Sequence, residues 1–154
     1  MEIKKSDLKL ESFSVLACSI ATIPSEIKIK SEDIVSHPIN LDFDILSNVK
    51  NKNKIRILIE IDSNSSENPK AGYAYSLAAE AEYYIKNLSK MDTDSQNKCI
   101  LFTALPLAIA MVRSHLYNGT SNFRYGQYLL PSIDLPDLFE KKFGNNTDKK
   151  DTAK

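Results

Sequence analysis

Residues 72–86 read Gly-Tyr-Ala-Tyr-Ser-Leu-Ala-Ala-Glu-Ala-Glu-Tyr-Tyr-Ile-Lys, and apolar side chains occupy every second position from Tyr73 to Ile85. This alternation is typical of a β-strand with one covered face, because successive side chains of a strand point to opposite sides of the sheet. The opposite face would carry Glu80 and Glu82. The length of the run predicts a strand longer than the usual five or six residues.

Two shorter segments with the same alternation precede it, at residues 39–45 and 55–61. The connection at residues 47–54 is rich in Asn and Lys, and the connection at residues 63–70 is also polar. Short polar connections of this kind form hairpins, so these three strands are expected to be antiparallel neighbours.

A fourth strand is expected near the N-terminus, over residues 7–15. Its alternation slips phase at Phe13 and Val15, which indicates a β-bulge or the end of the strand. Residues 16–38 are apolar but interrupted by Pro24. We therefore expect them to form a crossover that lies on other structure.

The apolar period changes to that of a helix after residue 90. Thr93 and Gln96 fit a capping box, and apolar residues then recur at spacings of three and four from Leu101 to Leu116. A second apolar stripe runs beside the first, and Pro106 is expected to kink the helix near residues 102–103. A helix that is apolar on two sides must be covered on two sides, by this sheet and by another chain or a ligand.

The C-terminal part predicts an extended arm over residues 123–132 and a short helix capped by Asp134 and closed by Gly144. Residues 145–154 are almost wholly polar and are expected to form a disordered tail. The prediction is one α+β domain over residues 1–144. It has a four-stranded antiparallel sheet, a long kinked helix and a short C-terminal helix.

Composition narrows the classes of function. The 154-residue chain is 42% hydrophobic and 26% charged, with a formal net charge of zero, so no strong attraction to nucleic acid is expected. The most apolar window, residues 99–112, falls short of the roughly 20 residues that a membrane span needs, so no membrane insertion is expected. With two cysteines and no signal-peptide pattern, a reducing cytoplasm is the expected location.

No catalytic or metal-binding constellation emerges from the residue types. Of the two histidines, His37 is followed by a proline and His115 lacks ligand-type neighbours at helical spacing. The surroundings of Cys18 and Cys99 give no sign of a lowered pKa. The four glycines do not assemble a phosphate loop. We therefore expect no enzyme, no cofactor and no metal. A small-molecule binder that encloses a pocket stays as a weaker alternative.

The C-terminal half resembles the SecB-type export chaperones. In that family a proline-containing apolar helix carries an arginine, and a leucine-rich arm leads through a turn to a short final helix. Leu105–Arg113, Tyr125–Leu135 and Leu138-Phe139 follow this order and spacing, with Arg113 in place of the helix arginine. The resemblance implies that the first strand pairs across a twofold axis and that two such dimers form a homotetramer.

The resemblance also implies ATP-independent holding of unfolded or nascent polypeptide in apolar grooves. The expected groove residues are Ile27, Ile29, Ile39, Leu41, Phe43, Ile45, Leu129 and Leu130. Periodicity alone leaves open whether Ile39 to Ile45 line a groove or belong to the core.

In exporting members of the family, an acidic residue on the outer face of the last strand binds the motor ATPase of the Sec translocase. The best register puts Ala78 at that position, with Glu80 and Glu82 nearby as candidate partner-binding residues. This departure keeps an alternative open: a dedicated chaperone of a single partner, such as an antitoxin, that is not coupled to Sec export.

Overall fold

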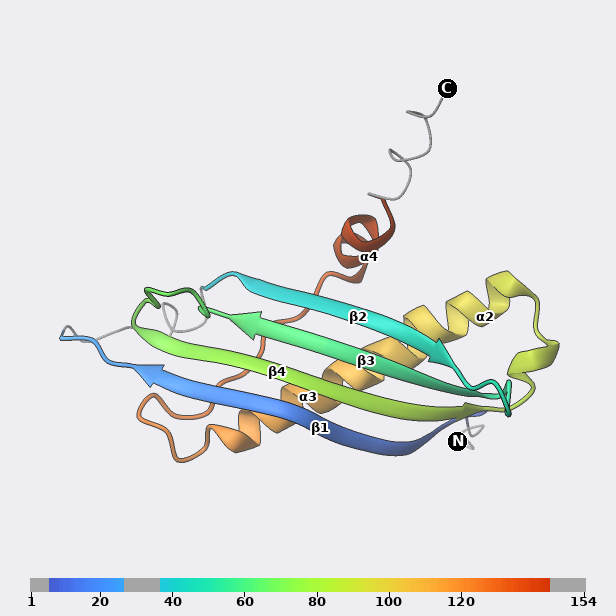
Figure 1. Cartoon of the computed structure of the whole chain (residues 1–154), viewed down its shortest axis with the longest axis horizontal. Coiled ribbons are helices and arrows are strands. Elements are labelled where there is room, and N and C mark those ends of the chain that lie inside the picture. The colour runs from blue at the N-terminus through green and yellow to red at the C-terminus, as the bar shows by residue number, and fades with distance from the viewer. Residues whose placement is uncertain (1–5, 27–36, 145–154) are drawn as a thin grey trace, which may run out of the picture.

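The computed structural model describes residues 6–26 and 37–144. Its strands form one antiparallel sheet in the order β1-β4-β3-β2 (Figure 1). The four strands are β1 (Leu8–Ile23), β2 (Ile39–Ser47), β3 (Lys54–Ser63) and β4 (Gly72–Ile85). The predicted three-strand meander is confirmed, and β1 pairs with the far side of β4.

The first strand is longer than predicted. The phase slip does mark a bulge, because the pairing with β4 shifts register between Leu10 and Ser12 and again between Val15 and Ala17. The strand does not end there, however, and continues to Ile23. The expectation that residues 16–38 form a crossover is therefore wrong for residues 16–23. A bulge restores pairing after an extra residue, which simple alternation does not detect.

The helices lie on one side of the sheet and beyond its β2 edge (Figure 1). The described helical elements are η1 (Leu88–Lys90), α2 (Thr93–Cys99), the π-helical turn η2 (Ile100–Ala104), α3 (Leu105–Gly119) and α4 (Leu135–Phe143). Together α2, η2 and α3 form one continuous run. The π-turn falls where Pro106 was expected to disturb the helix, since proline removes one hydrogen bond and crowds the preceding turn.

The helix caps confirm one prediction and correct another. Asp134 caps α4 by accepting the backbone N–H of Asp137 at 3.2 Å, as expected. The cap of α2 is Asp92 rather than Thr93, because the N–H of Ser95 donates to Asp92 Oδ1 at 2.9 Å. Both residue types cap well, so the sequence placed this boundary one residue late.

The covered face of the sheet is the one that the alternation predicts. Every odd-numbered residue of β3 from Ile55 to Ile61 and of β4 from Tyr73 to Ile85 is at most 3% exposed. Helix α3 packs on these two strands. Its buried face consists of Leu105, Ala108, Ile109, Val112 and Leu116.

The long helical run is covered on one side only. Phe102 is 59% exposed and Leu107 is 47% exposed. By length and composition, residues 93–119 are apolar enough to cross a membrane, although a core helix passes the same test, and 39% of the most apolar window is buried in this chain. Leu107 belongs to the second predicted stripe and is left uncovered, whereas Ile100 and Ala104 of the same stripe are buried.

One buried polar atom in this core yields a stability prediction. Tyr83 is fully buried, its hydroxyl has no partner among the described residues, and burial raises its pKa to about 12. Because an unpaired buried hydroxyl costs free energy, Tyr83→Phe is expected to raise the free energy of unfolding by about 1 kcal/mol in urea denaturation. The matched change Tyr75→Phe removes a contact to the Tyr128 hydroxyl at 3.3 Å and should lower it. Equal effects of the two changes would contradict this account of the core.

Candidate functional site

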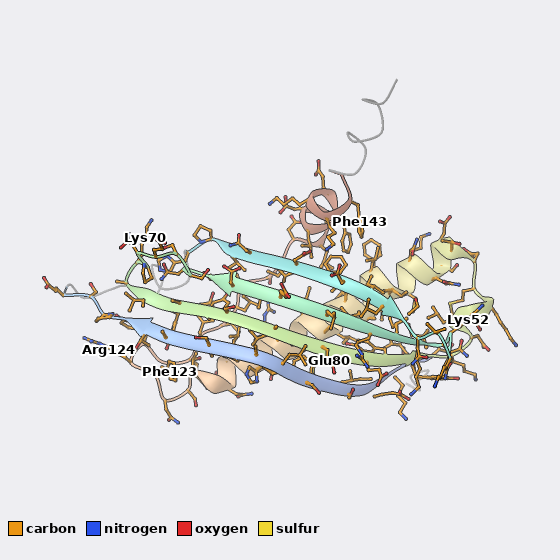
Figure 2. The ribbon with its side chains drawn as sticks, in the orientation of Figure 1. Lys52, Lys70, Glu80, Phe123, Arg124 and Phe143 are labelled. Carbon is orange, nitrogen blue, oxygen red and sulfur yellow. The ribbon has the colours of Figure 1, made fainter. Side chains whose placement is uncertain are left out.

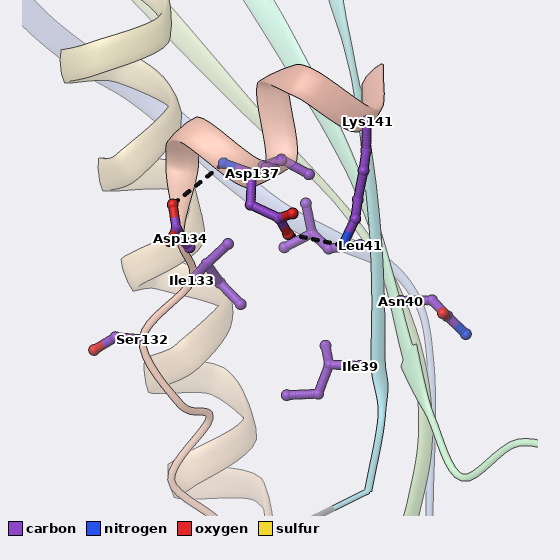
Figure 3. Close-up of a pocket in the computed structure, with 9 residues that line it drawn as sticks. Ile39, Asn40, Leu41, Ser132, Ile133, Asp134, Asp137 and Lys141 are labelled. Carbon is purple, nitrogen blue, oxygen red and sulfur yellow. Dashed lines mark hydrogen bonds and ion pairs between the residues drawn. The ribbon is translucent and has the colours of Figure 1, made fainter. Parts of the chain in front are cut away.

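A groove of about 460 Å³ runs between β2 and the segment that enters α4 (Figure 3). Its apolar lining comes from both sides, with Ile39 and Leu41 on the strand and Ile133 and Leu138 on the facing segment. The remaining lining residues are polar: Asn40, Ser132, Asp134, Asp137 and Lys141. The groove therefore combines apolar walls with a polar rim.

The strand side of the groove is also an open backbone edge. Strand β2 is the last strand of the sheet. The N–H of Asn48 donates to the carbonyl of Lys54 at 3.1 Å across the hairpin, which makes the even-numbered residues of β2 the ones bonded to β3. The N–H and C=O groups of Ile39 and Leu41 consequently point toward the open edge.

The other side of the groove depends on how α4 is positioned. Asp134 starts the helix, and Lys141 forms an ion pair with Asp137 at 2.8 Å along its surface. Leu138 is 9% exposed and packs into the core cluster. The side chain of Leu138 thus fixes α4 to the sheet beside the groove.

Beyond the groove, α4 covers β2 directly. Phe43 is 2% exposed, and the rings of Phe139 and Phe143 each lie 6.2 Å from its ring centroid. Lys142 Nζ lies 2.6 Å from a carboxylate oxygen of Asp42, and this contact lowers the pKa of Asp42 and raises that of Lys142. Around Phe43, β2 is therefore covered by the rings of Phe139 and Phe143 and by the ion pair between Asp42 and Lys142.

The structure answers which face the predicted β2 residues occupy. Ile39, Leu41, Phe43 and Ile45 all lie on the helix side of the sheet and pack against its core. Ile39 and Leu41 line the groove and are half-buried. Phe43 is a core residue in this arrangement, because α4 covers it.

The remaining predicted groove residues are not brought together. Leu129 is 59% exposed, whereas Leu130 is 1% exposed and lies in the core, where a client would not reach it. Ile27 and Ile29 lie outside the described residues.

Glu80 lies on the opposite face of the sheet from the helices (Figure 2). Glu82 lies two residues further along β4 and therefore on the same face. Glu80 forms an ion pair with Arg56 at 3.5 Å, and its side chain is 25% exposed. Glu82 lines a separate hollow of about 400 Å³ at the β2–β3 hairpin. Their role in partner binding stays a prediction, and they belong to a different surface from the groove.

Sequence reasoning missed the α4 side of the groove. The resemblance had pointed to Ile133, Asp134 and Leu138 as the entry to the final helix, but it did not place them opposite β2. Only the spatial course of the arm brings residues 132–141 beside residues 39–41. In the sequence, Ile133 and Leu138 show only as apolar residues at the start of the final helix, with no indication of what they pack against.

The His, Cys, Asp and Glu side chains of the described residues were candidates for a metal site or a reactive group. Within residues 6–26 and 37–144, no three His, Cys, Asp or Glu side chains are placed to hold a metal ion. His37 Nε2 lies 3.0 Å from the carbonyl oxygen of Ala71, and burial raises the pKa of both Cys18 and Cys99. What the site offers is an apolar, backbone-lined binding surface.

This architecture is a SecB-like fold: a four-stranded antiparallel sheet with a long helix and a short C-terminal helix on one side. Among solved structures, the chain is similar to the SecB-like chaperone Rv1957 of Mycobacterium tuberculosis, in complex with a ChAD peptide from the Rv1956 HigA1 antitoxin. The TM-score is 0.54 at 11% sequence identity, and the match covers 82% of this chain and 91% of that chain.

A protein of unknown function from Streptococcus agalactiae also matches, with a TM-score of 0.44 and 12% identity over 84% of this chain and 100% of that chain. No protein-family model matches the sequence. No curated protein matches it either.

The cap of α4 provides a test of how the groove wall is held. Asp134→Ala removes the side chain that accepts the Asp137 N–H and should destabilise the helix by about 1 kcal/mol. Hydrogen exchange is then expected to speed up in α4 while β3 and β4 stay protected. Asp134→Asn keeps the capping oxygen and is the matched control. Unchanged exchange in α4 of the alanine variant would show that the cap does not hold this wall.

Proposed function

We propose that this protein is an ATP-independent holding chaperone, which binds unfolded or nascent polypeptide in the groove beside β2. The observation that carries the proposal is the pairing of an apolar groove with an open strand edge at Ile39 and Leu41. The SecB-like fold and the peptide bound to its structural neighbour support it. We place this activity in the cytoplasm.

The chemistry of the groove matches what an unfolded chain exposes. An unfolded segment presents apolar side chains together with backbone N–H and C=O groups that lack protein partners. The groove walls bury the side chains, and the outward N–H and C=O groups of Ile39 and Leu41 can bond the backbone as an added strand does. At roughly 25 cal/mol per Å² of apolar surface, a few anchors give a useful but reversible affinity.

Reversible binding at one groove becomes firm holding when several grooves act on one client. Linked sites raise the effective concentration of the second binding event, so several weak contacts along one chain add up. No nucleotide is needed for such a cycle, because each contact forms and breaks independently.

We further propose that copies associate through β1, as a dimer of dimers. The outer edge of β1 carries no charged residue from Ser12 to Ile23, and Leu16 at its second bulge is 58% exposed. Long uncharged edges pair readily with another strand. The exposed side of the long helix, with Phe102 and Leu107, is the surface we propose for contact between dimers.

A second candidate function is that of a dedicated chaperone for one partner. The observation in its favour is that the peptide in the neighbouring complex comes from an antitoxin. A panel of unrelated unfolded proteins separates the two candidates. Comparable affinities across the panel favour general holding, whereas uniformly poor binding favours one dedicated partner. In either case, docking of a Sec motor ATPase at Glu80 and Glu82 is a separate hypothesis.

The first functional prediction concerns the groove wall. Leu41→Gln puts an amide into the apolar wall and is expected to weaken binding of a denatured client about tenfold. The readout is suppression of light scattering during client aggregation without nucleotide. Leu46→Gln is the matched control, because it makes the same change on the same strand, at a 48% exposed residue that faces the other side of the sheet.

Thermal unfolding of both variants shows whether either loses its fold. Wild-type protein that gives no suppression at severalfold excess over client would refute the holding function. Equal activity of the two folded variants would show that the client does not bind in the groove.

The second functional prediction concerns assembly. Leu16→Lys places a charge on the uncharged edge of β1. Leu16 lies at the middle of β1, so in a symmetric antiparallel pair of two copies the two charges would come close together. Native mass is expected to shift from a tetramer or dimer to smaller species, with circular dichroism unchanged. Leu46→Lys at the other sheet edge is the control and should leave the mass unaltered. A wild-type monomer at micromolar concentration would contradict the proposed assembly.

A further inference from the structure

The open edge of β2 is closed at one point by the chain itself. The N–H of Phe43 has the same parity as those of Ile39 and Leu41 and so points away from β3. It donates to Oδ1 of Asp42 at 2.8 Å. Among the described residues, no such side-chain cap occupies the N–H of Ile39 or Leu41. A client strand could therefore add along Ile39 and Leu41 but would meet an occupied donor at Phe43.

The carboxylate that caps Phe43 is itself held by α4. Lys142 Nζ lies 2.6 Å from Asp42 Oδ1, the same oxygen, and 3.2 Å from Asp44 Oδ1. The ammonium group also stands 5.5 Å from the centroid of the Phe43 ring. One lysine thus contacts both carboxylates and the ring of three consecutive residues, and bridges α4 to the edge.

The carboxylate side of this bridge is exposed, whereas the Lys142 side chain is 26% exposed. The side chains of Asp42 and Asp44 are 64% and 67% exposed. Ion pairs between such exposed groups are weak and are screened by salt. Lowering of the Asp42 pKa by Lys142 agrees with the contact but does not make it strong.

The helix that carries Lys142 is short, and Leu138 is its one side chain in the buried core. Helix α4 has nine residues, and a helix that short does not persist in water without packing. It stands beyond the β2 edge (Figure 1) and contacts the strand through the rings of Phe139 and Phe143. Phe143 is itself 47% exposed. An element held by a few side chains opens locally at low free-energy cost.

We propose that α4 is a latch on the binding groove, with Lys142 as its catch. In the latched state α4 covers the Phe43 ring and Asp42 occupies the Phe43 N–H. Release of Lys142 and α4 uncovers the Phe43 ring, and so extends the apolar surface open to a client from Leu41 to Phe43. This inference rests on the proposed function and adds its regulation by the chain's own C-terminal helix.

Latching lowers the apparent affinity for a client. If a client occupies the full surface only when α4 is released, the apparent dissociation constant equals the intrinsic one divided by the released fraction. Weakening the latch therefore tightens binding. Leu138 of α4 also lines the groove, so if its contact with the client outweighed the uncovered Phe43 ring, release of the helix would weaken binding instead.

The test compares Lys142→Gln with Lys52→Gln in the full-length chain. Both changes remove one positive charge, and Figure 2 shows Lys52 at the hairpin, far from Phe143 on α4. The probe is fluorescently labelled, reduced and carboxymethylated α-lactalbumin, which stays unfolded. Lys142→Gln is expected to bind it about three to ten times more tightly than Lys52→Gln does. Phe143→Ala weakens the latch by a different contact and should shift affinity in the same direction.

Hydrogen exchange without any probe supplies a second readout. Amides of α4 are expected to exchange faster in Lys142→Gln than in Lys52→Gln, with β3 and β4 unchanged. Equal binding and equal exchange in the two variants would overturn the latch, and so would weaker binding by Phe143→Ala. If wild-type protein does not bind the probe at all, the proposed function fails, and the exchange data still decide whether Lys142 holds α4.

Discussion

The contact between one sheet face and one side of the long helix holds this structure together. Tyr83, Leu105, Val112 and Leu116 are fully buried in it. Burial of a side chain the size of leucine stabilises a fold by roughly 1.5–3 kcal/mol, so a few such residues outweigh every surface contact described above. Small residues at the interface, Ala79, Ala81, Ala104 and Ala108, are at most 1% exposed and suit a close approach of helix and strand. The four-stranded sheet covers only one side of the helix, which leaves the other side for a further partner.

The helix covers the middle of the sheet, so the unpaired backbone groups of the sheet lie at its two edges, β1 and β2. The edge of β1 is long, uncharged and bulged, and leaves Leu16 exposed. The edge of β2 differs from it. Asp42 accepts the Phe43 N–H and pairs with Lys142, whereas Ile39 and Leu41 face the groove. Unprotected edges invite pairing with other chains, and proteins commonly block them with charges. Under the proposed function, the edge of β1 is the surface proposed for a second copy and the edge of β2 is the surface proposed for the client.

Much of the fold followed from periodicity, because strand alternation and helix stripes record which side of an element is covered. The inward residues of β3 and β4, the Pro106 disturbance and the Asp134 cap were all predictable in this way. The extension of β1 was not, since its two bulges interrupt the alternation without ending the strand. The burial of Leu130 was not predicted, and the sequence left open whether Phe43 lies in a groove or in the core. The second question depends on segments distant in sequence, since α4 lies nearly a hundred residues beyond Phe43. The same limit hid Ile133 and Leu138, whose partners across the groove only the folded chain reveals.

The most direct test of the central claim is residue-resolved hydrogen exchange at β2 with and without an unfolded client in excess. If the groove and its open edge hold the client, the amides of Ile39 and Leu41 gain protection when the client is added. Amides at the outer edge of β1 then keep their exchange rates. Protection at β1 or on the outer sheet face, with Ile39 and Leu41 unaffected, would contradict the account.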